Sequence, residues 1–218
     1  ASSSSKNSEP VRLNDEMLQV LAGLDHVTSV TPILSVDCIA KSGKYMGYLS
    51  VRGIPSELLA QMNNIEVAEG TLPVPGDQEL KFFYGNTVIT NFYVEKNNQY
   101  YWETGVVPEI NFMEDPMYVI FDTDAYYQSQ YPSENGTVTP PPNKYMIEAC
   151  GMMAGDVKTY GENSNYVFCD LELLKTQLKK VFKNKAIPGQ PTTSSGKPYK
   201  EIYYNQVDVK VDDMDNMK

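Results

Sequence analysis

The sequence of 218 residues is poor in cysteine and histidine, the residues that most often build disulfide frameworks and metal centres. Cys38, Cys150 and Cys169 are an odd number of cysteines, and none lies in a Cys-x-x-Cys pair. This excludes a disulfide framework. We expect three small buried hydrophobic residues, although a single bridge between two of them stays open. His26, the only histidine, is expected to cap the carbonyls of a helix or to face solvent rather than to serve in catalysis.

Basic charge is also scarce. The chain has 18 lysines and arginines against 28 acidic residues, which gives a formal net charge of −10. A protein that binds nucleic acid needs clustered Lys and Arg to neutralise phosphates, and no such cluster occurs here. The composition therefore excludes nucleic acid as a partner.

Long hydrophobic runs and nucleotide-binding motifs are missing as well. No segment reaches the roughly 18 apolar residues that a membrane-spanning helix needs. Neither GxxxxGK[ST] nor GxGxxG occurs, so no phosphate cradle is predicted. Acidic neighbours such as Asp122 and Asp124 arise by chance among 28 acids and do not indicate a glycosidase pair. We expect no catalytic residue, no cofactor and no metal ion.

The chain does contain a well-marked helix and strand at its start. Asn14 is a predicted N-cap, with Asp15 and Glu16 in the first turn, where the helix dipole favours carboxylates. The segment 27–33 is rich in β-branched residues and is predicted to be a strand. Residues three and four apart give the helix one apolar face: Leu13, Met17, Val20, Leu21 and Leu24.

Regular elements follow on both sides of an irregular middle. A hairpin turn at 41–44 leads to a return strand over 45–54, and a short helix is predicted over 57–62. In the last third we predict strands over 145–151, 167–169 and 202–211, and a helix that Asp170 caps and that runs to Lys183. Smaller strands are predicted at 81–85 and 117–121, and a brief helix capped by Asp122 or Thr123 runs through Gln130. Residues 212–215 look like a helix start with no helix after it, so we expect the chain to be a segment of a longer protein.

These patterns predict an α+β fold with a discontinuous domain. Residues 1–11 are expected to be a flexible tether because they are rich in serine. Segments 12–76 and 144–218 would form one subdomain, and 77–143 would be a smaller mixed α/β insertion. Insertion at an exposed turn disturbs little of the core and is well tolerated.

Aromatic residues are the most unusual candidates for a functional surface. Tyrosine and tryptophan provide a large contact area with few rotatable bonds, and they are enriched at recognition surfaces. Carbohydrate or peptide contact is one interpretation; the other is that these rings pack an insertion that is poor in aliphatic residues. The candidates all lie in the irregular middle: Tyr100, Tyr101, Trp102, Tyr126, Tyr127 and Tyr131.

A helix at the start, DHVTSVTP after it and VRGI at 51–54 follow one another in an order and spacing that resemble a known family, the MacB-like periplasmic core domain of FtsX-like ABC transporter permeases. The first helix and the sequence DHVTSVTP that follows it are similar to the opening of that domain, and VRGI is similar to its second strand. Further segments match in the same order: 69–72, 82–85, 146–151, 167–171 and 204–211.

The resemblance implies a porter-like subdomain made from both ends of the chain and an inserted Sabre-like subdomain. It also implies a non-catalytic domain on the extracytoplasmic side of a bacterial cell membrane, between two transmembrane helices of its own permease. Nucleotide hydrolysis would then belong to a separate ABC ATPase domain or chain, so the domain would not be an enzyme. The resemblance also implies a second permease copy and a peptide or lipoprotein as possible partners. The cargoes it suggests are peptides, lipoproteins and drugs. The alternative is a secreted carbohydrate- or peptide-binding module that uses the aromatic residues.

Overall fold

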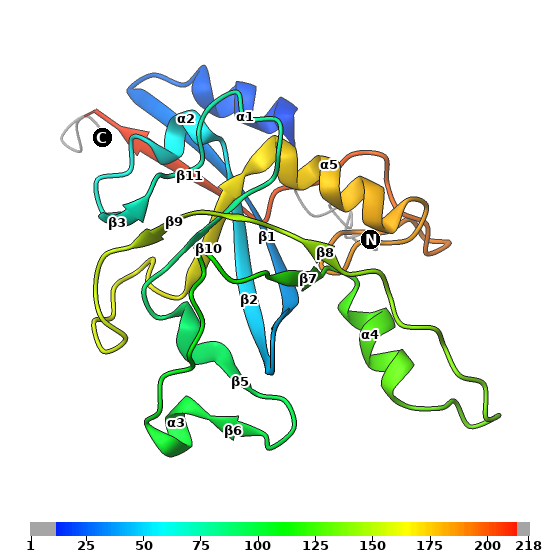
Figure 1. The fold of residues 1–218 in the computed structure, drawn as a ribbon. Helices are drawn as coiled ribbons and strands as arrows, with labels where there is room; N and C mark the ends of the chain where they lie inside the picture. The colour runs from blue at the N-terminus through cyan, green and yellow to red at the C-terminus, as the bar shows by residue number, and fades with distance from the viewer. Residues whose placement is uncertain (1–11, 213–218) are drawn as a thin grey trace, which may run out of the picture.

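The computed structural model describes residues 12–212 as a mixed sheet with helices packed against it (Figure 1). The helices are α1 (Asp15–Ala22), α2 (Ser56–Leu59), α3 (Tyr101–Thr104), α4 (Thr123–Gln130) and α5 (Leu171–Phe182), with a 3-10 turn η1 (Val88–Asn91). The strands are β1 (Val27–Ser42), β2 (Tyr45–Ile54), β3 (Val67–Gly70), β4 (Phe82–Tyr84), β5 (Phe92–Val94), β6 (Gln99–Tyr100), β7 (Tyr118–Ile120), β8 (Tyr145–Met146), β9 (Ala149–Met153), β10 (Tyr166–Asp170) and β11 (Gln206–Val211). The predicted α+β class is confirmed.

The sheet is organised around β1, which is 16 residues long. Its first half pairs with β11, with Val30 opposite Val209, and its second half pairs with β2, with Cys38 opposite Leu49. The last residues of β1 also pair with β7 on their other side. The strand order is β3-β9-β4-β10-β2-β1-β7-β8, and β11 and β5 are attached to β1 and β2.

One face of the sheet is covered by α5. Side chains alternate between the two faces of a strand, so Cys38 and Ala40 of β1 lie on the same face as Leu49 and Val51 of β2, and all four are buried. The apolar side of α5 packs there through Leu174, Leu178 and Phe182. A side chain at Gly53 would place its Cβ 2.8 Å from Leu174 Cδ2, so this glycine permits the close approach of α5.

The opposite face is less covered, and we call it the open face. Its β2 positions include Tyr48, Ser50 and Arg52; Tyr48 is exposed and the other two are half-buried, and Asp37 of β1 opposite Ser50 is exposed. Two smaller buried clusters close the ends of this face. One is built on Ile33, Ile54, Leu59, Phe83 and Phe168, and the other on Ile39, Met46, Tyr93, Ile120 and Tyr126.

The segment 77–143 contributes to the same sheet as its flanks. Strand β4 lies between β9 and β10, β5 pairs with β2, and β7 pairs with β1. Tyr84, Phe112 and Val119 from this segment belong to the main core together with Leu174. The division into a porter-like and a Sabre-like subdomain stays a prediction. The predicted tether 1–11 and the predicted helix start beyond Asp212 lie outside the described residues.

Helix caps account for much of the agreement between sequence and structure. The side chain of Asn14 accepts a hydrogen bond from the Met17 amide, Asp122 accepts from the Ala125 amide, and Asp170 accepts from the Leu173 amide. All three satisfy amides that a helix leaves unpaired at its start. The helices that these residues were predicted to begin are confirmed.

Four predicted elements differ clearly in extent. The strand predicted over 27–33 continues to Ser42 as β1, because its second half pairs with β2 and β7. The strand predicted over 145–151 is split into β8 and β9, because β8 pairs with β7 whereas β9 pairs with β3 and β4. The helix predicted over 57–62 is the single turn α2. The last strand begins only at Gln206, because the Gln190 side chain forms two hydrogen bonds with the backbone of Tyr203, at 2.8 and 2.9 Å. None of the helices described is long and apolar enough to cross a membrane.

All three cysteines are free thiols, so the possible bridge is not formed. Cys38 and Cys169 are fully buried, and burial raises the pKa of both thiols well above the usual range. Cys150 is half-buried, and burial raises its pKa to about 11. The thiolate is the reactive form, so all three thiols are unreactive at neutral pH.

We therefore predict slow thiol modification in the native protein. At pH 8 a disulfide exchange reagent should react with none of the three thiols quickly, whereas all three should react after denaturation without reductant. The reagent releases a chromophore for each thiol that reacts, so its absorbance counts the reactive thiols in the native and in the denatured protein. Only one reactive thiol in the denatured protein would contradict the free state of the cysteines.

Candidate functional site

Four aromatic rings form a continuous row at one end of the open face. From β2 outward they are Tyr48, Tyr93, Tyr100 and Trp102, and successive ring centroids are 6.5, 4.6 and 5.7 Å apart. The sheet aligns them, because Met46 pairs with Tyr93 and Tyr93 pairs with Tyr100. We call these four residues the aromatic row. Its outer part is carried by α3, β5 and β6, which lie near the β1–β2 turn in Figure 1.

Helix α4 adds two more tyrosines beside this row. The hydroxyl of Tyr127 donates a hydrogen bond to the Tyr48 hydroxyl at 3.1 Å. Tyr126 is buried, with its hydroxyl 3.6 Å from Met46 Sδ and the Lys41 ammonium 5.1 Å from its ring centroid. Lys41 also pairs with Glu95 at 3.0 Å, so its charge is balanced.

Two phenols of this cluster, those of Tyr127 and Tyr93, have raised pKa values and keep their protons at physiological pH. Burial, together with the hydrogen bond to Tyr48, raises the pKa of Tyr127 to about 12. Burial and the nearby Tyr48 also raise the pKa of Tyr93 above its ordinary value. The cluster therefore offers ring faces and hydroxyl groups, which suit stacking and hydrogen bonding, and no group poised for proton transfer or nucleophilic attack.

The structure brings together four of the six aromatic candidates: Tyr100, Trp102, Tyr126 and Tyr127. Tyr101 begins α3 and is half-buried, and Tyr131 follows α4 and is 75% exposed. Both interpretations of these rings have support, because Tyr126 packs in a buried cluster while Trp102 is 75% exposed. Sequence reasoning missed Tyr48 and Tyr93. The alternation along 45–54 places Tyr48 on the open face, but only the pairing of β2 with β5 brings Tyr93 beside it.

The other residues considered for chemistry have structural surroundings. His26 is exposed, which is one of the two situations expected for it. Its Nδ1 lies 3.2 Å from Asp212 Oδ1. Asp122 caps α4 and pairs with Lys185 at 2.5 Å, while Asp124 is exposed. Among residues 12–212 no three His, Cys, Asp or Glu side chains gather as a metal site would require.

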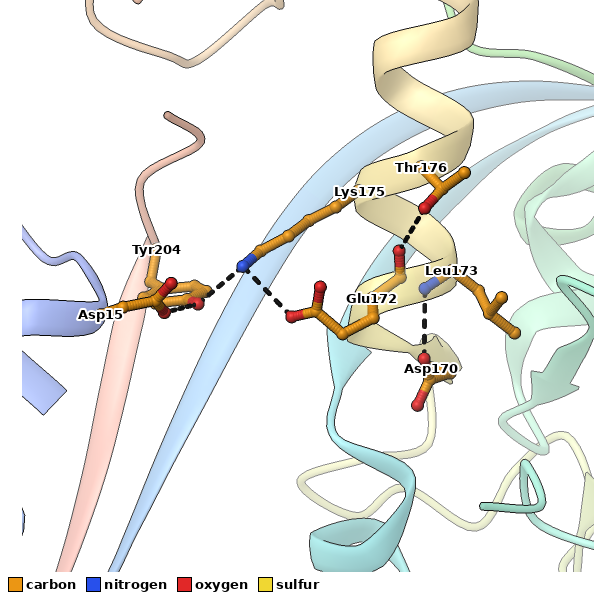
Figure 2. Close-up of polar contacts among 7 residues, drawn as sticks. All are labelled: Asp15, Asp170, Glu172, Leu173, Lys175, Thr176 and Tyr204. Atoms are coloured by element: carbon orange, nitrogen blue, oxygen red, sulfur yellow. Dashed lines mark hydrogen bonds and ion pairs between the residues drawn. The ribbon is translucent and has the colours of Figure 1, made fainter. Parts of the chain in front are cut away.

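A second feature joins the two ends of the described chain, and we call it the terminal tie (Figure 2). It consists of Asp15 of α1, Tyr204 just before β11, and Glu172 and Lys175 of α5. The buried Tyr204 hydroxyl donates to an Asp15 carboxylate oxygen and accepts from Lys175 Nζ at 2.7 Å. Lys175 Nζ also lies 3.3 Å from Glu172 Oε1.

The charges of the terminal tie reinforce one another. Burial raises the pKa of the Tyr204 phenol, and the hydrogen bond to Asp15 adds to this, so the phenol keeps its proton. Burial lowers the pKa of Lys175, but its bond to Tyr204 and its acidic neighbours outweigh this and raise it. Lys175 is therefore a permanent cation between two carboxylates, and hydrogen bonds to charged groups are the stronger kind.

Backbone hydrogen bonds place both chain ends along the first half of β1. The Tyr204 amide donates to the Leu13 carbonyl at 2.8 Å, and the Asp212 amide donates to the His26 carbonyl at 3.0 Å. Strand β11 and helix α1 thus lie beside the same part of β1, as Figure 1 shows. A force on either end of the described chain acts on that strand.

We predict a sharp difference between the inner and outer ends of the aromatic row. Tyr93→Ala should lower the free energy of unfolding by about 3 kcal/mol, because Tyr93 is only 7% exposed and its loss leaves a cavity. Trp102→Ala should cost less than about 1 kcal/mol, because the indole is mostly in solvent. Urea unfolding of both variants measures this. Equal losses would contradict the packing of the row.

Comparison with known proteins gives structural but not sequence matches. No family model and no curated protein sequence matches the chain. Among solved structures, the extracellular domain of the noncanonical ABC-type transporter YknZ from Gram-positive bacteria aligns with a TM-score of 0.50 and 12% identity. The alignment covers 95% of this chain and 77% of that one. The periplasmic region of MacB from Actinobacillus actinomycetemcomitans aligns with a TM-score of 0.44 and 13% identity, over 94% of this chain and 67% of that one.

The likeness to the YknZ domain extends over nearly all of the chain. At 12% identity it establishes the fold, and it agrees with the fold that the sequence motifs predicted. The chain has the fold of the extracellular domain of an ABC-type transporter.

Proposed function

We propose that this chain is a non-catalytic extracytoplasmic domain of a bacterial ABC transporter permease. It would couple movement of transmembrane helices at its two ends to the handling of a substrate or partner outside the membrane. Export of a peptide, a lipoprotein or a drug is the process it would serve. ATP hydrolysis would be the work of a separate ATPase domain or chain, bound through the membrane part, and a second permease copy is a further possible partner.

The observation that best supports this proposal is the convergence of both chain ends on β1. Strand β11 and helix α1 lie along the same half of β1, and the terminal tie links both to α5. A relative movement of two flanking helices would therefore be applied to one strand and passed into the sheet.

The aromatic row supports the alternative of a carbohydrate- or peptide-binding module. Trp102 is 75% exposed and stacks on Tyr100, as expected of a ring that is available to a ligand. This binding is compatible with the transporter role, since a permease domain also contacts what it handles.

The first test is the topology of the full-length protein in its bacterium. Gln128 is exposed on α4, so Gln128→Cys should be labelled by a membrane-impermeant maleimide on intact cells. The unaltered full-length protein is the control; within the present chain its thiols are buried or half-buried and have raised pKa values. Labelling only after the cells are permeabilised would refute an extracytoplasmic location.

The second test addresses coupling through the terminal tie. Lys175→Met removes the cation that Tyr204 and Glu172 share, and should lower the free energy of unfolding of the chain by about 1–3 kcal/mol. In the complete transporter it should reduce ATPase stimulation by substrate while basal ATPase activity is retained. Lys179→Met, at an exposed site on the same helix, is the matched control and should change neither quantity. Unchanged stimulation in Lys175→Met would argue against coupling through this contact.

A further inference from the structure

A cavity of about 300 Å³ opens on the open face, at the end away from the aromatic row. Its walls come from the first half of β1, from β11, from α2 and the residues after it, and from the turn before β10. Its floor is apolar and consists of Ile33, Ile54 and Phe168, all buried, with Leu58 and Met62 at the side. The volume is at the lower end of the range for small-molecule sites, which fits one or two amino-acid residues.

Arg52 contributes a cation to this cavity without a carboxylate partner. Its guanidinium carbon lies 3.8 Å from the Tyr166 ring centroid, so the ring supports the charge from one side. Its Nε is buried and makes no hydrogen bond within residues 12–212, and no acidic side chain of that range lies within 4.0 Å of its nitrogens. A half-buried guanidinium without an acidic partner is suited to bind a carboxylate from outside the chain, to which it would donate hydrogen bonds.

Asn163 supplies a second unused donor in the same cavity. The residue is 5% exposed, and its Nδ2 is buried without a hydrogen-bond partner in the part of the chain that the structure describes. Buried amide groups are nearly always paired, so an unpaired one beside a cavity is a candidate donor to an acceptor there. Arg52 of β2 and Asn163 of the turn before β10 thus both line this cavity.

The charged residues at the rim of the cavity indicate which kind of hydrogen-bond acceptor fits. Lys210 is exposed there, but so are Glu162 and Asp208, so the positive charges of Arg52 and Lys210 are balanced. With a net charge of −10 for the whole chain, a multiply charged anion such as phosphate is disfavoured. A single carboxylate joined to an apolar group satisfies the donors and covers the floor.

We propose that this cavity binds the C-terminal residue of a peptide whose last side chain is apolar. The carboxylate would lie against Arg52 and Asn163, and the side chain would lie on Ile54 and Phe168. A free apolar amino acid carries the same two groups, so the test includes it as a second source. The proposal does not depend on the transporter role, because binding is measured on the 218-residue chain alone.

The test is a calorimetric titration with alanyl-alanyl-leucine, with its C-terminal amide and with free leucine. The free-acid peptide should bind at least tenfold more tightly than the amide. Binding of free leucine as tight as that of the peptide would still support the carboxylate site and would identify the free amino acid as its ligand. Equal binding of the acid and the amide, or no binding of any of the three at millimolar concentration, would overturn the proposal and leave water as the occupant.

Variants assign the effect to the cavity. Arg52→Gln should abolish the preference for the acid over the amide. Arg12→Gln is the matched control, because Arg12 is the other arginine and also lies over a tyrosine ring, Tyr199, at 4.4 Å. Asn163→Asp keeps the size of the side chain but opposes the ligand carboxylate, and should weaken binding at least tenfold. Thermal unfolding shows whether each variant is folded, and an equal effect of Arg12→Gln and Arg52→Gln in folded protein would refute the site.

Discussion

The pairing of β1 with three other strands is the constraint on which the rest of the structure depends. A strand of 16 residues is too long for any one neighbour here, so β11 pairs with its first half and β2 and β7 with its second. Strand β11 comes from the far end of the chain, and β7 from the middle. Because backbone groups must be paired when they are buried, β1 cannot lose one of these neighbours without exposing part of its length. The strand therefore connects the beginning, the middle and the end of the sequence.

The alternation of side chains along β1 and β2 turns this pairing into two different surfaces. One face is uniformly apolar and is covered by α5. The other carries Tyr48, Ser50 and Arg52 in sequence along β2, and each is partly accessible. The period of two makes this inevitable, since every residue buried under α5 is followed by one on the open face. The aromatic row and the cavity at Arg52 are the two ends of that single line of side chains.

Local features of the sequence predicted the elements well because their causes are local. Asn14, Asp122 and Asp170 each accept a hydrogen bond from an amide three residues later, and no distant contact is needed for this. The β1–β2 hairpin needs only its turn and two alternating strands. The split between β8 and β9 could not be predicted in the same way, because it depends on which strands those residues meet. The late start of β11 likewise follows from Gln190, which binds Tyr203 from 13 residues away.

The candidate site shows the same division between local and non-local causes. Tyr100, Trp102, Tyr126 and Tyr127 were visible in the sequence as an excess of aromatic residues. The order of these rings in space was not visible in the sequence. Tyr93 lies between Tyr48 and Tyr100 only because β5 pairs with both β2 and β6. Arg52 was read as part of a strand motif, and nothing in its neighbours along the chain indicates that it lacks a carboxylate partner. The absence of a partner is a property of the folded chain and cannot be read from a charge count.

The position of the cavity relative to the chain ends gives the open face a physical connection to the terminal tie. Ser29 and Thr31 of β1 and Gln206 of β11 line the cavity, and they belong to the paired strand segments that begin at Val27 and end at Val211. A ligand can shift an equilibrium between two arrangements only if it binds one of them more tightly than the other. A ligand held between β1, β11 and α2 would meet this condition, because its contacts would change if those three elements moved against one another. If the proposed ligand binds there, its binding and a movement of the chain ends would act on the same pair of strands.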